Sequence, residues 1–240
     1  MEWLSNEERF SAIEENLKYI REDLAEAAIK SGRTLDDISL MAVTKTVEST
    51  FINHAIANGI GMIGENKVQE FLTKYDALKG TVPLHLIGHL QTNKVKKILP
   101  LVDMIQSVDS LHLAEEISKQ AVNNEFNCKI LLEVNVGNEE SKTGFDKEQF
   151  FDSLARISEL PNVTVNGIMT IPPICDDENE LKKYFLTMSQ YFNDIKEKGY
   201  KNFNMEILSM GMSGDYELAI ECGANLVRIG SLIYGARIYK

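Results

Sequence analysis

The sequence has few cysteines, no long apolar run and no secretion signal. Its three cysteines, Cys128, Cys175 and Cys222, are far apart and form no C-x-x-C pair, which argues against a disulfide framework or a cysteine zinc site. No run of eighteen apolar residues occurs, so the sequence predicts no membrane-spanning helix. The N-terminus is acidic and lacks the apolar stretch of a signal peptide. These absences predict a cytoplasmic protein with reduced thiols.

Positive charge is also scarce. Lysine and arginine number 25 against 36 acidic residues, which gives a formal net charge of −11. Such a surface repels nucleic acids and anionic membranes, so we expect neither as a partner. A ligand that carries phosphate would need a small, local positive site. The expected partner is a small molecule.

The rest of the composition is sufficient for a large hydrophobic core. The 240 residues are 44% hydrophobic, and α/β barrels reach this length as a single unit. No linker or internal repeat divides the chain, so we expect one domain over residues 1–240. Residues 5–31 predict an extra N-terminal amphipathic helix, because apolar residues recur there at spacings of three and four. Ser5 and Glu8 match a capping box at its start.

After this helix, short apolar runs alternate with helical patterns. The runs that predict strands are 38–43, 62–64, 84–88, 102–108, 129–136, 163–171, 205–210 and 226–229. The patterns that predict helices are 49–58, 66–78, 91–99, 110–123, 147–159, 177–198 and 213–222. Eight near-continuous apolar strands separated by helices indicate a parallel sheet covered on both faces. We predict a single (β/α)₈ TIM barrel, with a doubly wound open sheet as the alternative.

Two patterns resemble functional motifs without the context that these motifs require. Residues 59–64 match G-x-G-x-x-G, but a helix precedes them and the last glycine lies in a strand. A dinucleotide site needs the reverse order, so we predict a helix C-cap and a tight turn. His85 and His89 are four residues apart on a strand and its loop, where they do not converge as helical ligands would. We expect no metal site.

Polar residues follow the predicted strands at the edge where barrel enzymes carry their active sites. Lys45 emerges directly from the first strand, and apolar surroundings favour its neutral, nucleophilic amine. Such an amine can form a Schiff base with a carbonyl ligand. The alternative is a structural ion pair with Glu65 or Glu133.

Glycine and hydroxyl residues occur in the loops after the seventh and eighth strands. Barrel phosphate sites are typically built from these two loops. Gly211, Ser213 and Gly214 allow close backbone approach, and Ser213 is a candidate N-cap for the next helix. Gly230 and Ser231 supply the second turn. A phosphate site is the favoured interpretation, and turn chemistry alone is the alternative.

Arg228 lies just before the second of these turns. An arginine stays protonated, so beside a pyridine nitrogen it can only donate a hydrogen bond and leaves that nitrogen unprotonated. A cofactor held in this way is a weak electron sink. A salt bridge or a direct phosphate contact are the alternatives for Arg228.

Seven ordered segments resemble the pyridoxal phosphate homeostasis protein family (the YggS/PROSC group), which is related to the N-terminal barrel of alanine racemases. The resemblance covers nearly the whole chain. The segments are AVTKT at 42–46, GENKVQE at 64–70, HLIGHLQTNK at 85–94, SVDS at 107–110, NVGNEESKTG at 135–144, GIMTIPP at 167–173 and LSMGMSGDYELAIECGANLVRIGSLIYGAR at 208–237. Val47 and Glu48 depart from the Lys-Pro pair that many members carry there.

The resemblance implies a role for each candidate residue. It implies that Lys45 holds pyridoxal 5′-phosphate, the vitamin B6 aldehyde, as a Schiff base, and that Arg228 contacts the pyridine nitrogen. The residues that it implies for the phosphate and the ring pocket are Ser213, Gly230 and Ser231, and then Asn66 and Met210. Lys142 matches a family lysine that takes up or passes on cofactor, although a solvated loop lysine is the favoured interpretation.

The resemblance further implies a cofactor carrier rather than an enzyme. Alanine racemases add a β domain that delivers a tyrosine as second base, and this chain ends a few residues after its eighth strand. With Lys45 as the one evident base, we expect little or no turnover and no catalytic residues. We expect a monomer that supplies apo forms of pyridoxal-phosphate enzymes. A single-domain amino-acid racemase is the first alternative, and a cofactor-free phosphosugar aldolase with Lys45 as its amine is the second.

Overall fold

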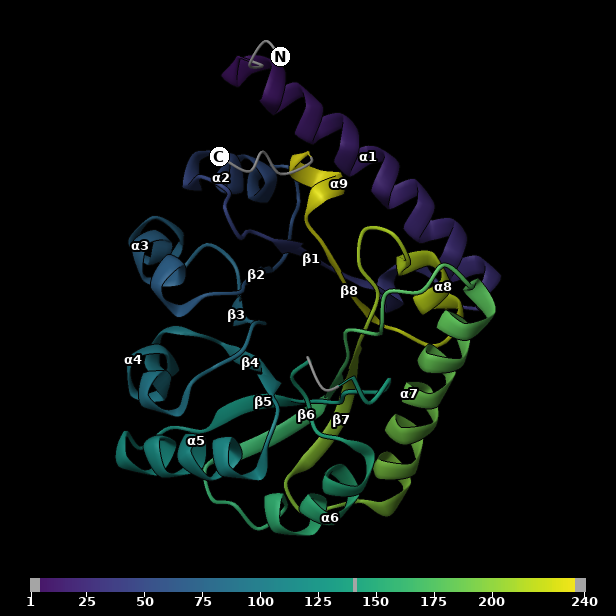
Figure 1. Cartoon of the computed structure of the whole chain (residues 1–240). Helices are drawn as coiled ribbons and strands as arrows, with labels where there is room; N and C mark the ends of the chain where they lie inside the picture. The colour runs from purple at the N-terminus through teal and green to yellow at the C-terminus, as the bar shows by residue number, and fades with distance from the viewer. Residues whose placement is uncertain (1–4, 140–141, 236–240) are drawn as a thin grey trace.

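The computed structural model describes residues 5–139 and 142–235, and its eight parallel strands close into a barrel (Figure 1). The strands pair in chain order, and β8 pairs with β1. Their bounds are β1 Ser39–Val43, β2 Ile63–Glu65, β3 Leu84–Leu86, β4 Met104–Val108, β5 Cys128–Glu133, β6 Val163–Met169, β7 Phe203–Ser209 and β8 Leu226–Ile229. The predicted barrel is confirmed, and closure excludes the open sheet.

Helices follow the strands and surround the barrel (Figure 1). Their bounds are α1 Asn6–Lys30, α2 Ser49–Ala57, α3 Val68–Leu78, α4 Val95–Ile98, α5 Leu111–Asn123, α6 Lys147–Ile157, α7 Glu178–Lys198, α8 Tyr216–Glu221 and α9 Ser231–Tyr234. The 3₁₀ turns are η1 Leu35–Asp37, η2 Thr92–Lys94 and η3 Leu99–Leu101. Among the described helices, none combines the length and the apolar character that crossing a bilayer requires.

The N-terminal helix α1 forms as predicted and packs against α2, α8 and α9. Its capping box is present: Ser5 N–H donates to Glu8 Oε2 at 2.7 Å, and Glu8 N–H donates to Ser5 Oγ at 3.2 Å. Its apolar stripe is buried, and Tyr216 of α8 donates to Asp23 at 2.9 Å. The helix therefore lies outside the barrel, against the helices that follow β1, β7 and β8.

Alternation along the strands separates two kinds of core. Residues of one face form the large cluster between the barrel and its helices, whereas the other face fills the barrel interior. The interior apolar clusters comprise Met41, Val43, Ile87 and Leu226, and then Met104, Leu131 and Met169. This packed interior leaves the C-terminal ends of the strands as the place for a site.

Two local predictions have different outcomes. Gly59, at φ 89°, ends α2, and Ile60 N–H donates to Ala55 O at 3.1 Å. The predicted C-cap is therefore confirmed as a Schellman-type end. The helix predicted at 91–99 is wrong in its extent, because one α-helical turn is flanked there by the 3₁₀ turns η2 and η3. Pro100 lies in η3 and cannot donate the hydrogen bond that would continue a helix.

Candidate functional site

Strand register brings Lys45 next to two of the other candidate residues. Val43 of β1 is paired with Gly64 of β2, so Asn66 reaches the level of Lys45. On the other side, Ala42 is paired with Ile229 of β8, and a Cβ built on Gly230 would lie 3.3 Å from Val43 Cβ. Lys45 is half-buried between these two strand ends.

Lys45 lies just beyond the end of β1, whose last residues alternate between the barrel interior and its outer face. Met41 and Val43 belong to the cluster inside the barrel, whereas Thr44 turns its hydroxyl outward to Glu65 Oε2 at 3.1 Å. Side chains alternate along a strand. Lys45 lies two residues after Val43, in the turn that Val47 N–H closes on Thr44 O, and so stands at the C-terminal rim of the barrel.

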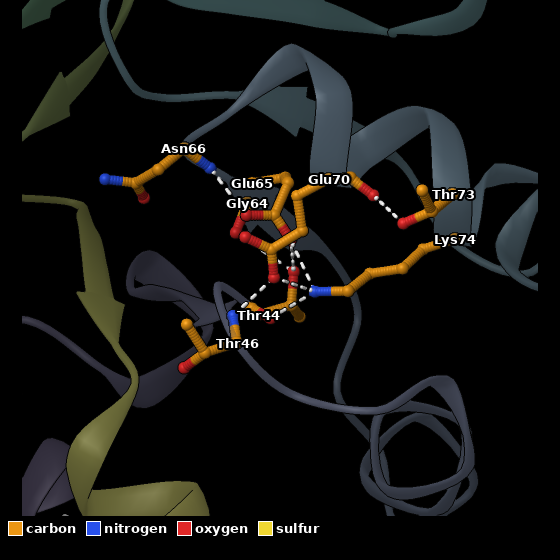
Figure 2. A network of polar contacts seen from close by, with 8 residues as sticks. All are labelled: Thr44, Thr46, Gly64, Glu65, Asn66, Glu70, Thr73 and Lys74. Atoms are coloured by element: carbon orange, nitrogen blue, oxygen red, sulfur yellow. Dashed lines mark hydrogen bonds and ion pairs between the residues drawn. The ribbon is translucent and has the colours of Figure 1, made fainter. Parts of the chain in front are cut away.

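Asn66 carries an unused polar atom. Its backbone N–H donates to Glu65 Oε1 at 2.9 Å, and its carboxamide points away from the Glu65 cluster (Figure 2). Within the described residues, no hydrogen-bond partner reaches its buried Oδ1. Gly88 of the neighbouring loop permits this placement, because a Cβ there would lie 2.2 Å from Asn66 O. A buried amide oxygen without a partner is the kind of atom that a ligand satisfies.

The loop after β7 is fixed by an aspartate rather than by Ser213. Asp215 Oδ1 accepts a hydrogen bond from Met212 N–H at 2.5 Å, and Asp215 is the N-cap residue of α8. The prediction that Ser213 caps this helix is therefore wrong, because the Asp215 side chain closes the turn. Ser213 is half-buried in this turn.

The β7 and β8 loops lie together at the rim. Arg228 N–H donates to Gly211 O at 3.0 Å, and Met210 N–H donates to Leu226 O at 3.2 Å. Ser231 begins α9 and is exposed, with Gly230 as its N-cap residue. Met210 is fully buried and its side chain belongs to the core between barrel and helices. The structure thus brings Ser213, Gly230 and Ser231 to the same end of the barrel as Lys45.

Arg228 is fully buried inside the barrel and belongs to a chain of polar contacts. Its guanidinium donates to Ser209 Oγ at 2.7 Å and to Thr170 O at 2.8 Å. Ser209 Oγ donates to Gln106 Oε1 at 2.8 Å, and Gln106 Nε2 lies 2.9 Å from His85 Nδ1. Burial lowers the pKa of Arg228 to about 10, so it is cationic at neutral pH. Three of its five N–H groups remain after these two bonds.

Glu133 places a second unused oxygen at the end of β5. Its Oε1 accepts a hydrogen bond from Thr143 Oγ1 at 2.8 Å, whereas its buried Oε2 has no hydrogen-bond partner among the described residues. Burial raises the pKa of the Glu133 carboxyl, and Asp109 adds to this shift, while the Thr143 hydrogen bond, Arg228 and His89 oppose it. Arg228 can therefore donate to an acceptor or anionic group of a ligand, whereas the unpartnered oxygens of Asn66 and Glu133 can accept only from a donor group.

Glu65, which the sequence offered as an ion-pair partner for Lys45, is bound by Lys74 at 2.9 Å. Lys74 also donates to Thr44 O at 2.7 Å, and pairs with Glu70 at 2.5 Å (Figure 2). Sequence reasoning missed Glu70 and Lys74. Their spacing of four residues within a predicted helix was the available signal, but it is also the spacing of ordinary surface ion pairs.

Lys142 is bound at the opposite side of the mouth. It donates to Pro172 O at 2.7 Å and pairs with Glu139 at 2.7 Å.

His89 contacts Asp109 at 2.8 Å. Across the described ranges, no group of three or more metal-ligating side chains occurs.

Thr46, directly after Lys45, has an unfavourable backbone conformation that a substitution can relieve. Its φ is 66°, which is rare for a β-branched residue, and Val47 N–H donates to Thr44 O at 3.0 Å across this turn. Asparagine tolerates such a φ, so Thr46→Asn is expected to raise the free energy of unfolding by about 1 kcal/mol. Urea unfolding measures this change. Thr46→Val keeps the β-branch and is expected to give no gain; an equal gain in both variants would contradict the strain argument.

Comparisons with known proteins agree along nearly the whole chain. The model of the family described as alanine racemase, N-terminal domain, matches residues 10–238. A pyridoxal phosphate homeostasis protein of Aquifex aeolicus is 41% identical over 226 residues, which are 94% of this chain and 98% of that relative.

Two solved structures have the same fold over similar coverage. An unknown protein from Bifidobacterium adolescentis gives a TM-score of 0.91 at 36% identity and covers 98% of both chains. PipY of Synechococcus elongatus PCC7942, solved with PLP (pyridoxal phosphate) bound, gives a TM-score of 0.81 at 30% identity, over 93% of this chain and 100% of PipY.

Proposed function

Because the chain belongs to the pyridoxal phosphate homeostasis protein family, whose barrel is that of the alanine racemase N-terminal domain, we propose that it binds pyridoxal 5′-phosphate and serves in homeostasis of this cofactor. The supporting observation is that strand register gathers Lys45, the Arg228 guanidinium and the β7 and β8 loops at one barrel end. We further propose a single-domain, monomeric, cytoplasmic carrier that supplies apo-enzymes.

The cofactor brings an aldehyde, a phosphate and a pyridine ring, and the candidate residues match each group. A neutral lysine amine condenses with an aldehyde to a Schiff base, and the carbonyl oxygen leaves as water with both amine protons. We propose Lys45 for this bond. Ser213, Gly230 and Ser231 would hold the phosphate. Asn66 would line the ring pocket with its side chain, and Met210, whose side chain packs between the barrel and its helices, would border the pocket through its backbone.

Arg228 would limit catalysis. Its remaining N–H groups can donate to the pyridine nitrogen, and it is cationic at neutral pH because its pKa of about 10 is still well above 7. A ring nitrogen beside a permanent donor stays unprotonated and withdraws electrons weakly. Hydrogen bonds to Ser209 and Thr170 restrict the movement of the guanidinium. These residues therefore favour binding over amino-acid turnover.

Borohydride trapping tests the binding proposal. The protein mixed with pyridoxal phosphate is expected to turn yellow, and reduction should leave the cofactor on the Lys45 peptide in a mass spectrum. Lys45→Ala should lose the absorbance and the label, while Lys142→Ala, which alters a lysine on another loop, should keep both. A label on a different lysine of the unmodified chain would contradict the assignment.

A chirality assay separates the carrier from the racemase. Cofactor-loaded protein incubated with L-alanine or L-serine is expected to release no more than traces of the D-isomer. Enzymes typically turn over at about 1–10³ s⁻¹. A rate in that range would replace the carrier with the single-domain racemase, and trapping of a sugar phosphate on Lys45 without yellow colour would favour the aldolase.

A further inference from the structure

An ion-pair cluster binds both peptide groups that flank Lys45 (Figure 2). On one side, Lys74 Nζ donates to Thr44 O at 2.7 Å. On the other side, Thr46 N–H donates to Glu70 Oε1. Lys74 and Glu70 also pair with each other at 2.5 Å. We refer to Glu70 and Lys74 together as the clamp, because one salt bridge joins the residues that hold the backbone before and after Lys45.

The clamp is anchored to the barrel by Glu65. The Glu65 carboxylate receives Lys74 at 2.9 Å, Thr44 Oγ1 at 3.1 Å and Asn66 N–H at 2.9 Å. The side chains of Lys74 and Glu65 are only 12% and 4% exposed. Hydrogen bonds between ionised groups are strong, and poor access of water strengthens them further. The cluster therefore connects α3 rigidly to the ends of β1 and β2.

The backbone at this point needs such support. Thr46 has φ 66° in the turn that Val47 N–H closes on Thr44 O. A β-branched residue in this conformation persists where its surroundings enforce it. The hydrogen bond from Thr46 N–H to Glu70 supplies part of that constraint. Without it, the turn that carries Lys45 can relax to a more favourable φ.

We infer that Glu70 and Lys74 are positioning residues, which hold the Lys45 backbone so that its amine meets the aldehyde of the bound cofactor. This inference rests on the proposed function. A displacement of 1 Å between held groups costs about 100-fold in the rate at which they react. The bond that a displaced amine does form pulls the ligand or the backbone out of its preferred place, so the affinity for the aldehyde falls as well. Neither clamp residue is proposed to touch the cofactor.

Two ligands that differ only at the reacting carbon test the inference. Pyridoxal 5′-phosphate carries the aldehyde, whereas pyridoxine 5′-phosphate has the same ring and phosphate but an alcohol in its place. For Glu70→Ala we expect the affinity for the aldehyde, followed by absorbance, to fall about 10- to 100-fold. The affinity for the alcohol, followed by calorimetry, should stay within about 2-fold, because the clamp acts through Lys45 alone.

Three further variants separate positioning from a general structural role. Glu70→Gln keeps an oxygen for Thr46 N–H and Lys74 and should restore most of the lost affinity. Lys74→Met removes the other half of the clamp and should give the same split between the two ligands, which provides a second reading if Glu70→Ala fails to fold. Lys79→Met breaks the exposed pair with Asp76 at the end of α3 and should change neither affinity.

Each outcome decides the inference. Equal loss of both ligands in the clamp variants would show a structural effect and overturn it, as would unchanged affinity for both. If the unmodified chain binds the two ligands equally and borohydride leaves no label on Lys45, the proposed function is wrong, and the inference about the clamp is wrong with it. A loss of affinity for the aldehyde alone supports the inference that the clamp positions Lys45.

Discussion

Replacing Gly167 with alanine is expected to lower the free energy of unfolding by about 4 kcal/mol, an effect at the upper end for one substitution. Gly167 lies in β6 with φ 151°, a conformation that side chains rarely adopt. A Cβ built there would lie 1.8 Å from Ile207 O of β7. Because the clash is with a backbone atom, it is relieved only if β6 and β7 move apart.

Gly61→Ala is the matched control for this prediction. Gly61 lies in the loop before β2, and apart from its two chain neighbours no described residue comes within 4 Å of its built Cβ. Alanine there lowers the conformational entropy of the unfolded chain and causes no clash in the folded state. The free energy of unfolding is therefore expected to rise by up to about 1 kcal/mol. Urea unfolding followed by circular dichroism measures both variants. Equal stability of the two would contradict the steric argument.

Gly167 also affects the candidate site, because it lies where the register of β6 against β7 shifts. The β6–β7 pairing shifts between Val165 and Gly167, and beyond the shift Met169 is paired with Ser209. Thr170, the next residue, then offers its carbonyl to Arg228 at 2.8 Å. Bulges are common near functional sites because they redirect a strand end. We therefore expect Gly167→Ala to weaken cofactor binding even under conditions where the variant remains folded.

Features that depend on neighbouring residues in the sequence were predictable. The α1 helix and its Ser5–Glu8 capping box follow from spacing and from local hydrogen bonds. The Gly59 helix end follows from the rarity of positive φ in other residues. Eight apolar runs separated by helices indicated the barrel, because strands buried on both faces need near-continuous apolar sequence.

Features that depend on tertiary packing were not predictable. Ser213 and Asp215 are both suitable capping residues, and only the folded loop shows that Asp215 accepts the Met212 N–H. Glu70 and Lys74 have the spacing of a surface pair, and their burial against Thr44 depends on where α3 lies on the barrel. The register shift at Gly167 likewise has no signal in the alternation of β6, because it is fixed by the pairing with β7.

The contacts around Arg228 also make the barrel sensitive to acid through His85. His85 lies inside the barrel, where its Nδ1 contacts Gln106, which in turn binds Ser209 and hence Arg228. Burial lowers the pKa of His85 from 6.5 to about 4. The folded state therefore holds this imidazole neutral over a pH range in which the unfolded chain binds a proton.

The sign of the linkage follows from the lowered pKa. Above pH 6.5, the histidine is neutral in both states and its contribution is fully present. Between pH 6.5 and 4, the unfolded chain takes up the proton first, so the free energy of unfolding falls by up to 1.36 kcal/mol per pH unit and by about 3 kcal/mol in total. Below pH 4, the loss is complete.

Urea unfolding at a series of pH values isolates this contribution. His85→Gln offers an amide oxygen to Gln106 without a titrating group, so its stability should fall less than that of the unmodified chain, with the difference growing by about 3 kcal/mol between pH 6.5 and 4. His112→Gln removes an exposed histidine of α5. Its free energy of unfolding should fall with pH in the same way as that of the unmodified chain. If the free energies of unfolding of His85→Gln and of the unmodified chain fell in parallel with pH, the barrel interior would accept a charged imidazole, which would contradict the prediction. Water would then reach the residues around Arg228.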